Sequence, residues 1–228
     1  MSVREFFNEL GGTRVEGELI KTIAFSLVSS FAIVAILYYL RLRFIASFWM
    51  SQGFFLLLAL VGYACVVPVV HHIRAYRTFA CMPGMMIGMT LGMIAGFLAG
   101  FFVGATNGMF VGGVFGMVVG ITLGAWMGSC SCGIMGFMEG TMAGFMGGLM
   151  GAMTAVMLLN DHLRLASVLV LVVCIVMLGG LHYMTYSEMK REQRQRSDSQ
   201  ALVIGLSLIL AFVTTWLMVY GPRSGLFG

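Results

Sequence analysis

Methionine is the residue whose number and spacing point most clearly to chemistry in this sequence. The chain has 21 methionines, and most of them lie in residues 81–157. At 100° per residue, a set near the end of this stretch falls within a sector of about 120° on one helix face. The set is Met135, Met138, Met142, Met146, Met150, Met153 and Met157. Thioether sulfur is a soft ligand suited to Cu(I) or Ag(I), so this face would offer an ion successive weak sites.

An earlier part of the same stretch repeats the pattern with Met82, Met85, Met86, Met89 and Met93. From the two groups together, the candidate metal ligands are Met85, Met89, Met135, Met138, Met142 and Met146. The alternative is that methionine, whose side chain is flexible, only fills irregular gaps between thin helices. The sequence is compatible with both interpretations.

Glu139 is the one acid inside any predicted membrane span, and on the helical wheel it lies on the methionine face. A carboxylate in hydrocarbon is costly, so we expect it to face a cavity or a partner and to bind an ion or relay a proton. The alternative is that Glu139 lies close enough to the headgroups to reach water.

Two cysteines at C-x-C spacing, Cys130 and Cys132, can hold a linear Cu(I), and Cys81 could add a third donor. The small residues around them also suit a tight turn within the membrane. The spacing of structural zinc sites is absent. Because the five cysteines are odd in number and two lie in predicted spans, a disulfide framework is not expected, and a reducing cytosol would keep the thiols free.

The histidines and one asparagine are weaker candidates. His71 and His72 precede Arg74 and form either an entrance for an ion or a basic end to a membrane span. We expect His182, like Cys65 and Cys174, to be a packing residue. We expect Asn107 either to form a turn or to line the outer end of a path.

Pairs four residues apart resemble the MxxxM element of the Ctr copper-transporter family, which also uses GxxxG packing. They are Met82/Met86, Met85/Met89, Met138/Met142 and Met142/Met146. In that family the methionines of a trimeric pore pass Cu(I), so the resemblance implies a similar role here. It covers short motifs within residues 81–157. Ctr proteins have three spans and a methionine-rich outer tail, which this chain lacks.

Glycine determines how these methionines are positioned. It recurs at every fourth position in two registers, which supply the predicted packing residues Gly84, Gly88, Gly92, Gly96, Gly100, Gly104, Gly112, Gly116, Gly120, Gly124, Gly136, Gly140, Gly144 and Gly148. In a membrane the unsatisfied backbone of an unfolded segment is so costly that such a stretch stays helical. The glycines then form a strip on which another helix can pack closely.

One helix cannot contain the whole glycine run. Residues 84–128 would extend roughly 67 Å, against about 30 Å of hydrocarbon. The polar interruptions at 105–108, which contain the turn dipeptide Asn-Gly, and at 129–133 predict the reversals. We therefore expect three glycine-lined spans over about 82–105, 109–128 and 134–158.

The whole chain is predicted to be an all-α integral membrane protein with about seven transmembrane helices and a glycine-zipper core formed by spans three to five. It has 228 residues, of which 60% are hydrophobic and 10% charged. We divide it into a cytoplasmic N-terminal segment (1–18), a two-helix hairpin (19–77), a Gly/Met-rich three-helix core (78–160) and a C-terminal two-helix segment (161–228) with a basic cytoplasmic loop (187–200).

Seven spans place the two termini on opposite sides of the membrane. Of the 13 Lys and Arg residues, nine fall on the side of the N-terminus and four on the other side. The positive-inside rule therefore predicts a cytoplasmic N-terminus and an outside C-terminus, in what we expect to be a bacterial cytoplasmic membrane. The net charge of +4 reflects this topology, and no nucleic-acid partner is expected.

The absent motifs narrow the possible functions. The sequence has no phosphate loop, no nucleotide fold and no catalytic triad pattern, so we do not expect an enzyme. The leading hypothesis is a transporter, channel or buffer for a soft metal ion, most plausibly Cu(I), along methionine-lined helix faces. The alternative is a glycine-zipper scaffold or oligomeric anchor without transport. In either case we expect contact with the lipid bilayer and assembly as a homo-oligomer or with partner helices.

Overall fold

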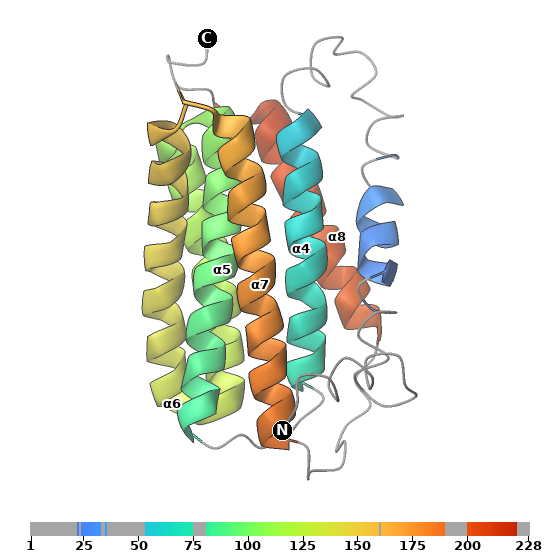
Figure 1. Ribbon diagram of the computed structural model, residues 1–228, viewed down its shortest axis with the longest axis vertical. Coiled ribbons are helices and arrows are strands. Elements are labelled where there is room, and N and C mark those ends of the chain that lie inside the picture. The colour runs from blue at the N-terminus through green and yellow to red at the C-terminus, as the bar shows by residue number, and fades with distance from the viewer. Residues whose placement is uncertain are drawn as a thin grey trace.

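The computed structural model describes residues 22, 24–32, 35, 53–74, 81–159, 161–189 and 200–222 (Figure 1). Every regular element within these residues is a helix. Beyond a helical stretch between residues 22 and 35, the helices are α4 (Gly53–Arg74), α5 (Cys81–Asn107), α6 (Met109–Met157), α7 (Leu163–Met189) and α8 (Gln200–Tyr220). The N-terminal segment 1–18 and most of the basic loop 187–200 lie outside the described residues.

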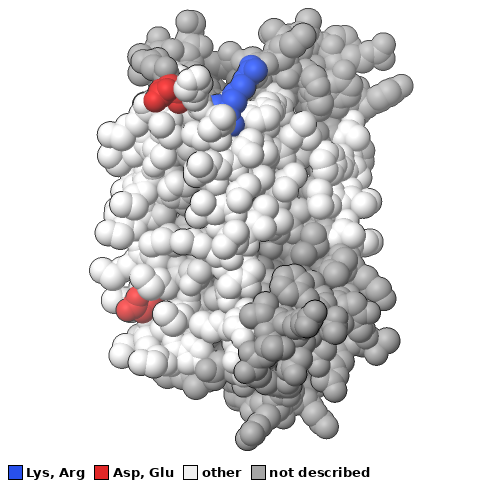
Figure 2. All heavy atoms as spheres, in the orientation of Figure 1, with Lys and Arg blue, Asp and Glu red and all other residues white. Residues whose placement is uncertain are grey.

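Four of the helices are long and apolar enough to cross a membrane: α4, α5, α6 and α7. Helix α8 adds a shorter apolar stretch, Ile204–Tyr220. The face of the molecule in Figure 2 is almost free of charged side chains over its middle. A surface of this kind belongs in hydrocarbon, because apolar side chains exposed over such an area would be unfavourable in water. The all-helical prediction is confirmed within the described residues, and four of their helices could span a membrane. The seven spans and the glycine zipper stay predictions.

Helix α5 ends at the Asn-Gly dipeptide, where the sequence predicted a turn. Gly108 separates α5 from α6 and has φ 107° and ψ 171°, a conformation that glycine adopts without the steric penalty of a side chain. The backbone N–H of Gly108 donates to the carbonyl of Gly104 at 3.1 Å, and that of Gly112 donates to Gly108 at 3.0 Å. The reversal is therefore tight and remains hydrogen-bonded.

Helix α6 doubles back on itself within its 49 residues. Cys132 (φ −138°) and Gly133 (φ 64°, ψ −136°) are non-helical and divide it into halves of residues 109–131 and 134–157. A Cβ added to Gly133 would meet no atom within 4 Å, so the position is not crowded. Its positive φ angle is what favours glycine there. The halves are antiparallel, because the contacts run in opposite directions along them: Gly128 meets Gly136, Gly124 meets Gly140 and Gly120 meets Gly144.

Glycines of α5 and of both halves of α6 meet in successive layers. A methyl group added to Gly92 would lie 2.8 Å from the carbonyl oxygen of Gly140 and 3.0 Å from the Cα of Gly124. The other layers are Gly88 with Gly128 and Gly136, Gly96 with Gly120 and Gly144, Gly100 with Gly116 and Gly148, and Gly104 with Gly112 and Ala152. Three backbones thus approach one another with no side chain between them except the methyl group of Ala152 in the last layer.

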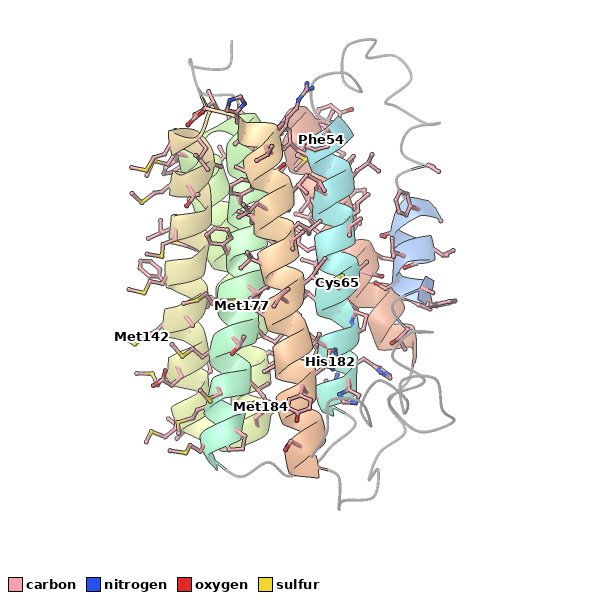
Figure 3. The ribbon with its side chains drawn as sticks, in the orientation of Figure 1. Phe54, Cys65, Met142, Met177, His182 and Met184 are labelled. Atoms are coloured by element: carbon pink, nitrogen blue, oxygen red, sulfur yellow. The ribbon has the colours of Figure 1, made fainter. Side chains whose placement is uncertain are left out.

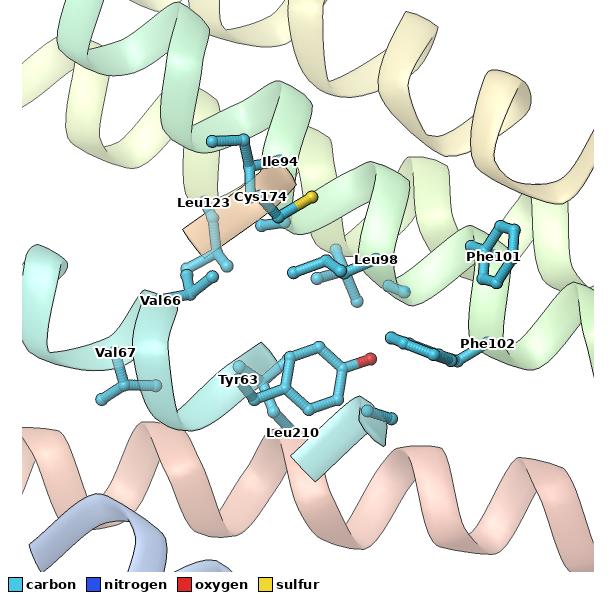
Figure 4. Packing of buried hydrophobic residues seen from close by; sticks show 14 of the residues in the cluster. Tyr63, Val66, Val67, Ile94, Leu98, Phe101, Phe102, Leu123, Cys174 and Leu210 are labelled. Carbon is cyan, nitrogen blue, oxygen red and sulfur yellow. The ribbon is translucent and has the colours of Figure 1, made fainter. Parts of the chain in front are cut away.

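The remaining helices pack on one side of this three-helix unit. Helix α4 contacts α5, α7 and α8, and α5 also contacts α7 and α8. Large side chains fill this region, including the fully buried Tyr63, Leu98 and Phe102, together with Leu210 of α8 (Figure 4). The molecule therefore has two kinds of packing: backbone on backbone within α5 and α6, and side chain on side chain around α4.

Candidate functional site: the methionine face of α6

The second half of α6 separates its glycines and methionines onto opposite sides. Gly136, Gly140, Gly144 and Gly148 are buried against the other backbones. The predicted ligands on the same half are exposed, Met138 by 59% and Met142 by 72%, and Figure 3 shows Met142 pointing away from the molecule. The exposed set is Met135, Met138, Met142, Met146, Met150, Met153 and Met157, which we call the methionine face. This half of α6 therefore buries its glycines and exposes its methionines. The role of these residues as ligands stays a prediction.

The methionine face does not fill gaps within the chain. Methionine has that role elsewhere in this structure, since Met127 and Met218 are fully buried in the apolar core. The side chains of the face instead cover the outside of α6. Within the described residues, an ion path through a single copy has no space along the glycine layers, because even a methyl group would collide with backbone there.

Several methionines of α5 are also exposed. Met82, Met86 and Met89 are exposed, and Met85 is partly exposed. Gly147 of α6 packs directly against the backbone of Met93 in α5. The two methionine-bearing helices are therefore in contact along their length, so the predicted ligands Met85 and Met89 lie on the helix that adjoins the face.

Glu139 is exposed on the methionine face. The part of the chain that the structure describes provides it with no ion-pair partner. Its neighbour Thr141 donates to the carbonyl of Phe137 in its own helix at 2.7 Å and so is not directed at the carboxylate. An acid surrounded by exposed methionines on a membrane helix is unfavourable when it faces lipid alone.

The cysteines differ from the expectation of free thiols. Cys130 is free and exposed, and Cys65 and Cys174 are also free, but Cys132 is disulfide-bonded. The bend in α6 is the physical reason that Cys132 has close neighbours, because it brings this residue to within 3.2 Å of the Cβ position of Gly84 at the start of α5. A pair of free thiolates at Cys130 and Cys132 is therefore not present. The side chain of Cys81 lies outside the described residues.

The end of the molecule near this bend also holds the pair His72 and His182. His72 of α4 and His182 of α7 are in ring contact, with centroids 5.1 Å apart. The guanidinium of Arg74 lies over the ring of Trp126 at 5.0 Å. The sequence indicated His72 but not its pairing with His182, because the two residues are 110 positions apart and only the packing of α4 on α7 brings them together.

Asn107, at the opposite end of α5, is structural in this arrangement. Its side-chain amide donates to the carbonyl of Leu217 in α8 at 2.7 Å, and the hydroxyl of Thr106 donates to its side-chain oxygen at 2.8 Å. Asn107 is almost completely buried. It therefore combines the predicted turn with a link to α8.

Groups of three or more His, Cys, Asp or Glu side chains able to hold a metal ion do not occur in the described ranges. Among the described residues, the methionine face is notable because it combines exposed thioethers with the exposed carboxylate of Glu139. No protein family, curated protein or solved structure matches this sequence or its fold. The described residues define the class as an all-helical protein with four helices long and apolar enough to span a membrane.

Proposed function

We propose that this protein spans the membrane seven times and assembles so that the methionine faces of neighbouring copies meet and bind or conduct a soft metal ion, most plausibly Cu(I). In this arrangement the glycine layers of α5 and α6 act as a glycine zipper that makes each copy rigid and leaves the thioethers on its surface. The ion then passes between copies, because the interior of the three-helix unit has no room for it.

The observation that carries this proposal is the exposure of Glu139 among exposed methionines. Methionine alone is compatible with lipid, since its side chain is apolar. A carboxylate is not, so this face requires water, a cation or a polar partner when it is in the membrane. Thioethers flanking a single carboxylate suit a soft monovalent cation, which they bind weakly enough to release.

The orientation in the proposal follows from the Lys and Arg distribution, with the N-terminus in the cytoplasm. The bend at Cys132 and Gly133 and the histidine pair are then at the cytoplasmic end. Asp161 and His162, both exposed beside the start of α7, are at the outer end. The protein would reside in a bacterial cytoplasmic membrane.

The proposal is tested by a triple variant, Met138→Leu, Glu139→Gln and Met142→Leu, with Met177→Leu as the matched control. Met177 is an exposed methionine of α7, 55% accessible and away from the methionine face. Cells are supplemented with copper, and the metal content of the purified full-length protein is measured by mass spectrometry. We expect copper in the wild type and the control, and a loss of at least half of it in the triple variant.

A second function is favoured by the glycine layers themselves, which need no metal to explain them. In that case the protein is a scaffold or anchor, and Glu139 forms hydrogen bonds to a neighbouring helix. Native mass spectrometry on the same samples separates the two. A defined oligomer that contains no copper in the wild type would exclude the metal function and leave the scaffold.

A further inference from the structure

Two buried imidazole rings meet where α4 packs on α7. His72 and His182 contact each other edge to face, with ring centroids 5.1 Å apart and an interplanar angle of 68°. His72 is only 4% exposed and His182 is partly buried. Figure 3 shows His182 toward the lower end of α7, beside α4. The edge-to-face arrangement is a preferred packing geometry of aromatic rings, and we call it the histidine contact.

The surroundings of the histidine contact suit neutral imidazoles and not a charged one. Nδ1 of His182 and Nε2 of His71, the residue before His72, are buried and have no hydrogen bond in the described part of the chain. In a protonated imidazole both nitrogens are donors. A proton on His182 would therefore leave the N–H at Nδ1 without an acceptor and would bury a charge, which is unfavourable unless the charge is paired.

The charged residues of the packed helices would not compensate for that proton. Arg74, the last residue of α4, is itself a cation and lies over the ring of Trp126 at 5.0 Å. The sequences of α5 and α8 contain no charged residue. On α7, Tyr183 follows His182 with a phenol, and the acid Glu188 is six residues beyond His182, about 9 Å along the axis and about 240° round the helix. Protonation would thus add a second positive charge at an end without a facing acid on these helices.

We infer that the histidine contact is sensitive to pH: it holds α4 against α7 while both imidazoles are neutral, and it opens when either ring takes up a proton. An imidazole in water has a pKa of about 6.5. The contact is therefore complete above this pH. As the pH falls below it, the open form gains population by up to about tenfold per pH unit for one proton. In the orientation proposed above, the contact responds to the pH of the cytoplasm.

The test measures hydrogen–deuterium exchange by mass spectrometry on the full-length protein in detergent, from about pH 8 to about pH 5. Protection factors, which are corrected for the intrinsic effect of pH on exchange, are compared between two pairs of segments. Residues 66–74 and 178–186 form the contact, and residues 101–107 and 163–170 lie at the other end. We expect the first pair to lose up to about tenfold in protection per pH unit below about pH 6.5, and the second pair to lose none.

A double variant, His72→Phe with His182→Phe, keeps two rings that can pack edge to face and removes both groups that take up the proton. Its protection at the contact should not change with pH. His162→Gln, at an exposed position on the other end of the molecule, is the matched control and should behave as the wild type.

Three results would overturn the inference. Wild-type protection that does not fall in acid, or that falls equally in all four segments, would show that the two rings only pack against each other. The same acid-induced loss in the double variant would assign the pH dependence to another group, such as His71. None of these measurements involves a metal ion, so their outcome is independent of the proposed function.

Discussion

At the scale of single residues, glycine and methionine divide one helix between two roles. In the second half of α6, Gly140 and Gly144 contact the backbones of the first half, and Met138 and Met142 occupy the opposite surface. In water this composition would give an unstable helix, because glycine costs about 1 kcal/mol relative to alanine. In the membrane the same glycine allows backbone contact, which becomes a source of stability.

Replacement of an interior glycine should therefore destabilise the protein, against the trend of helix propensity. The methyl group of Gly92→Ala would lie 2.8 Å from the carbonyl oxygen of Gly140, and backbone cannot rotate away as a side chain does. We expect a loss of about 1–3 kcal/mol, typical of overpacking. The loss is measured as a lower midpoint of unfolding in SDS titration of the detergent-solubilised protein.

Gly180→Ala is the control for this prediction. The added methyl group on α7 meets no atom within 4 Å, so only the gain in helix propensity remains. Its unfolding midpoint should equal or exceed that of the wild type. Equal midpoints for the two alanine variants would contradict the close approach of the three backbones.

Residue patterns predicted faces well but did not predict what those faces meet. The period of four identified the buried glycine side and the exposed methionine side of α6. In a soluble protein the exposed side of such a helix would be polar, and its environment would be water. Here both sides are apolar, so the pattern alone does not distinguish lipid from a neighbouring copy. The sequence did not predict the disulfide of Cys132 for a related reason, since this bond depends on the exact position of the bend in α6.

At the scale of elements, the positions of the reversals were predictable and the neighbours of each helix were not. Asn107 and Gly108 end α5 as the turn dipeptide indicated, and the bend in α6 falls within the predicted interruption at 129–133. The contacts of α4 with α7 and α8 had no sequence signal. When apolar spans have similar length and composition, the sequence does not show which span packs against which. The contact between His72 and His182 therefore could not be predicted.

The link between α5 and α8 gives a prediction about elements. Asn107→Ala removes the amide that donates to the carbonyl of Leu217 at 2.7 Å. We expect a loss of about 1 kcal/mol, because hydrogen bonds between membrane helices have this order of magnitude. The midpoint of unfolding in SDS, followed by tryptophan fluorescence, measures it.

Thr122→Val is the matched variant for Asn107→Ala. The hydroxyl of Thr122 bonds only to carbonyls of its own helix, Val118 at 2.8 Å and Val119 at 3.0 Å. Its removal should leave the unfolding midpoint within experimental error of the wild type. An Asn107→Ala protein as stable as Thr122→Val would mean that the contact with Leu217 does not hold α8 in place.

At the scale of the whole molecule, the two ends differ in the chemistry they carry. One end has the bend of α6 with Cys130, the ring pair of His72 and His182, and Arg74 over Trp126. The other has the turn at Gly108 and the exposed Asp161. The orientation of the chain in the membrane decides which of these two ends faces the cytoplasm.

The distribution of Lys and Arg predicts that the Cys130 end is cytoplasmic, and a free, exposed thiol already marks that end. In intact spheroplasts a membrane-impermeant maleimide should leave Cys130 unmodified and should modify it after permeabilisation. In the variant Cys130→Ser with Asp161→Cys, the new thiol should react in intact cells. Cys130→Ser alone measures the background. Labelling of Cys130 from outside would reverse the orientation, and it would place the disulfide of Cys132 in the oxidising compartment, where disulfides persist.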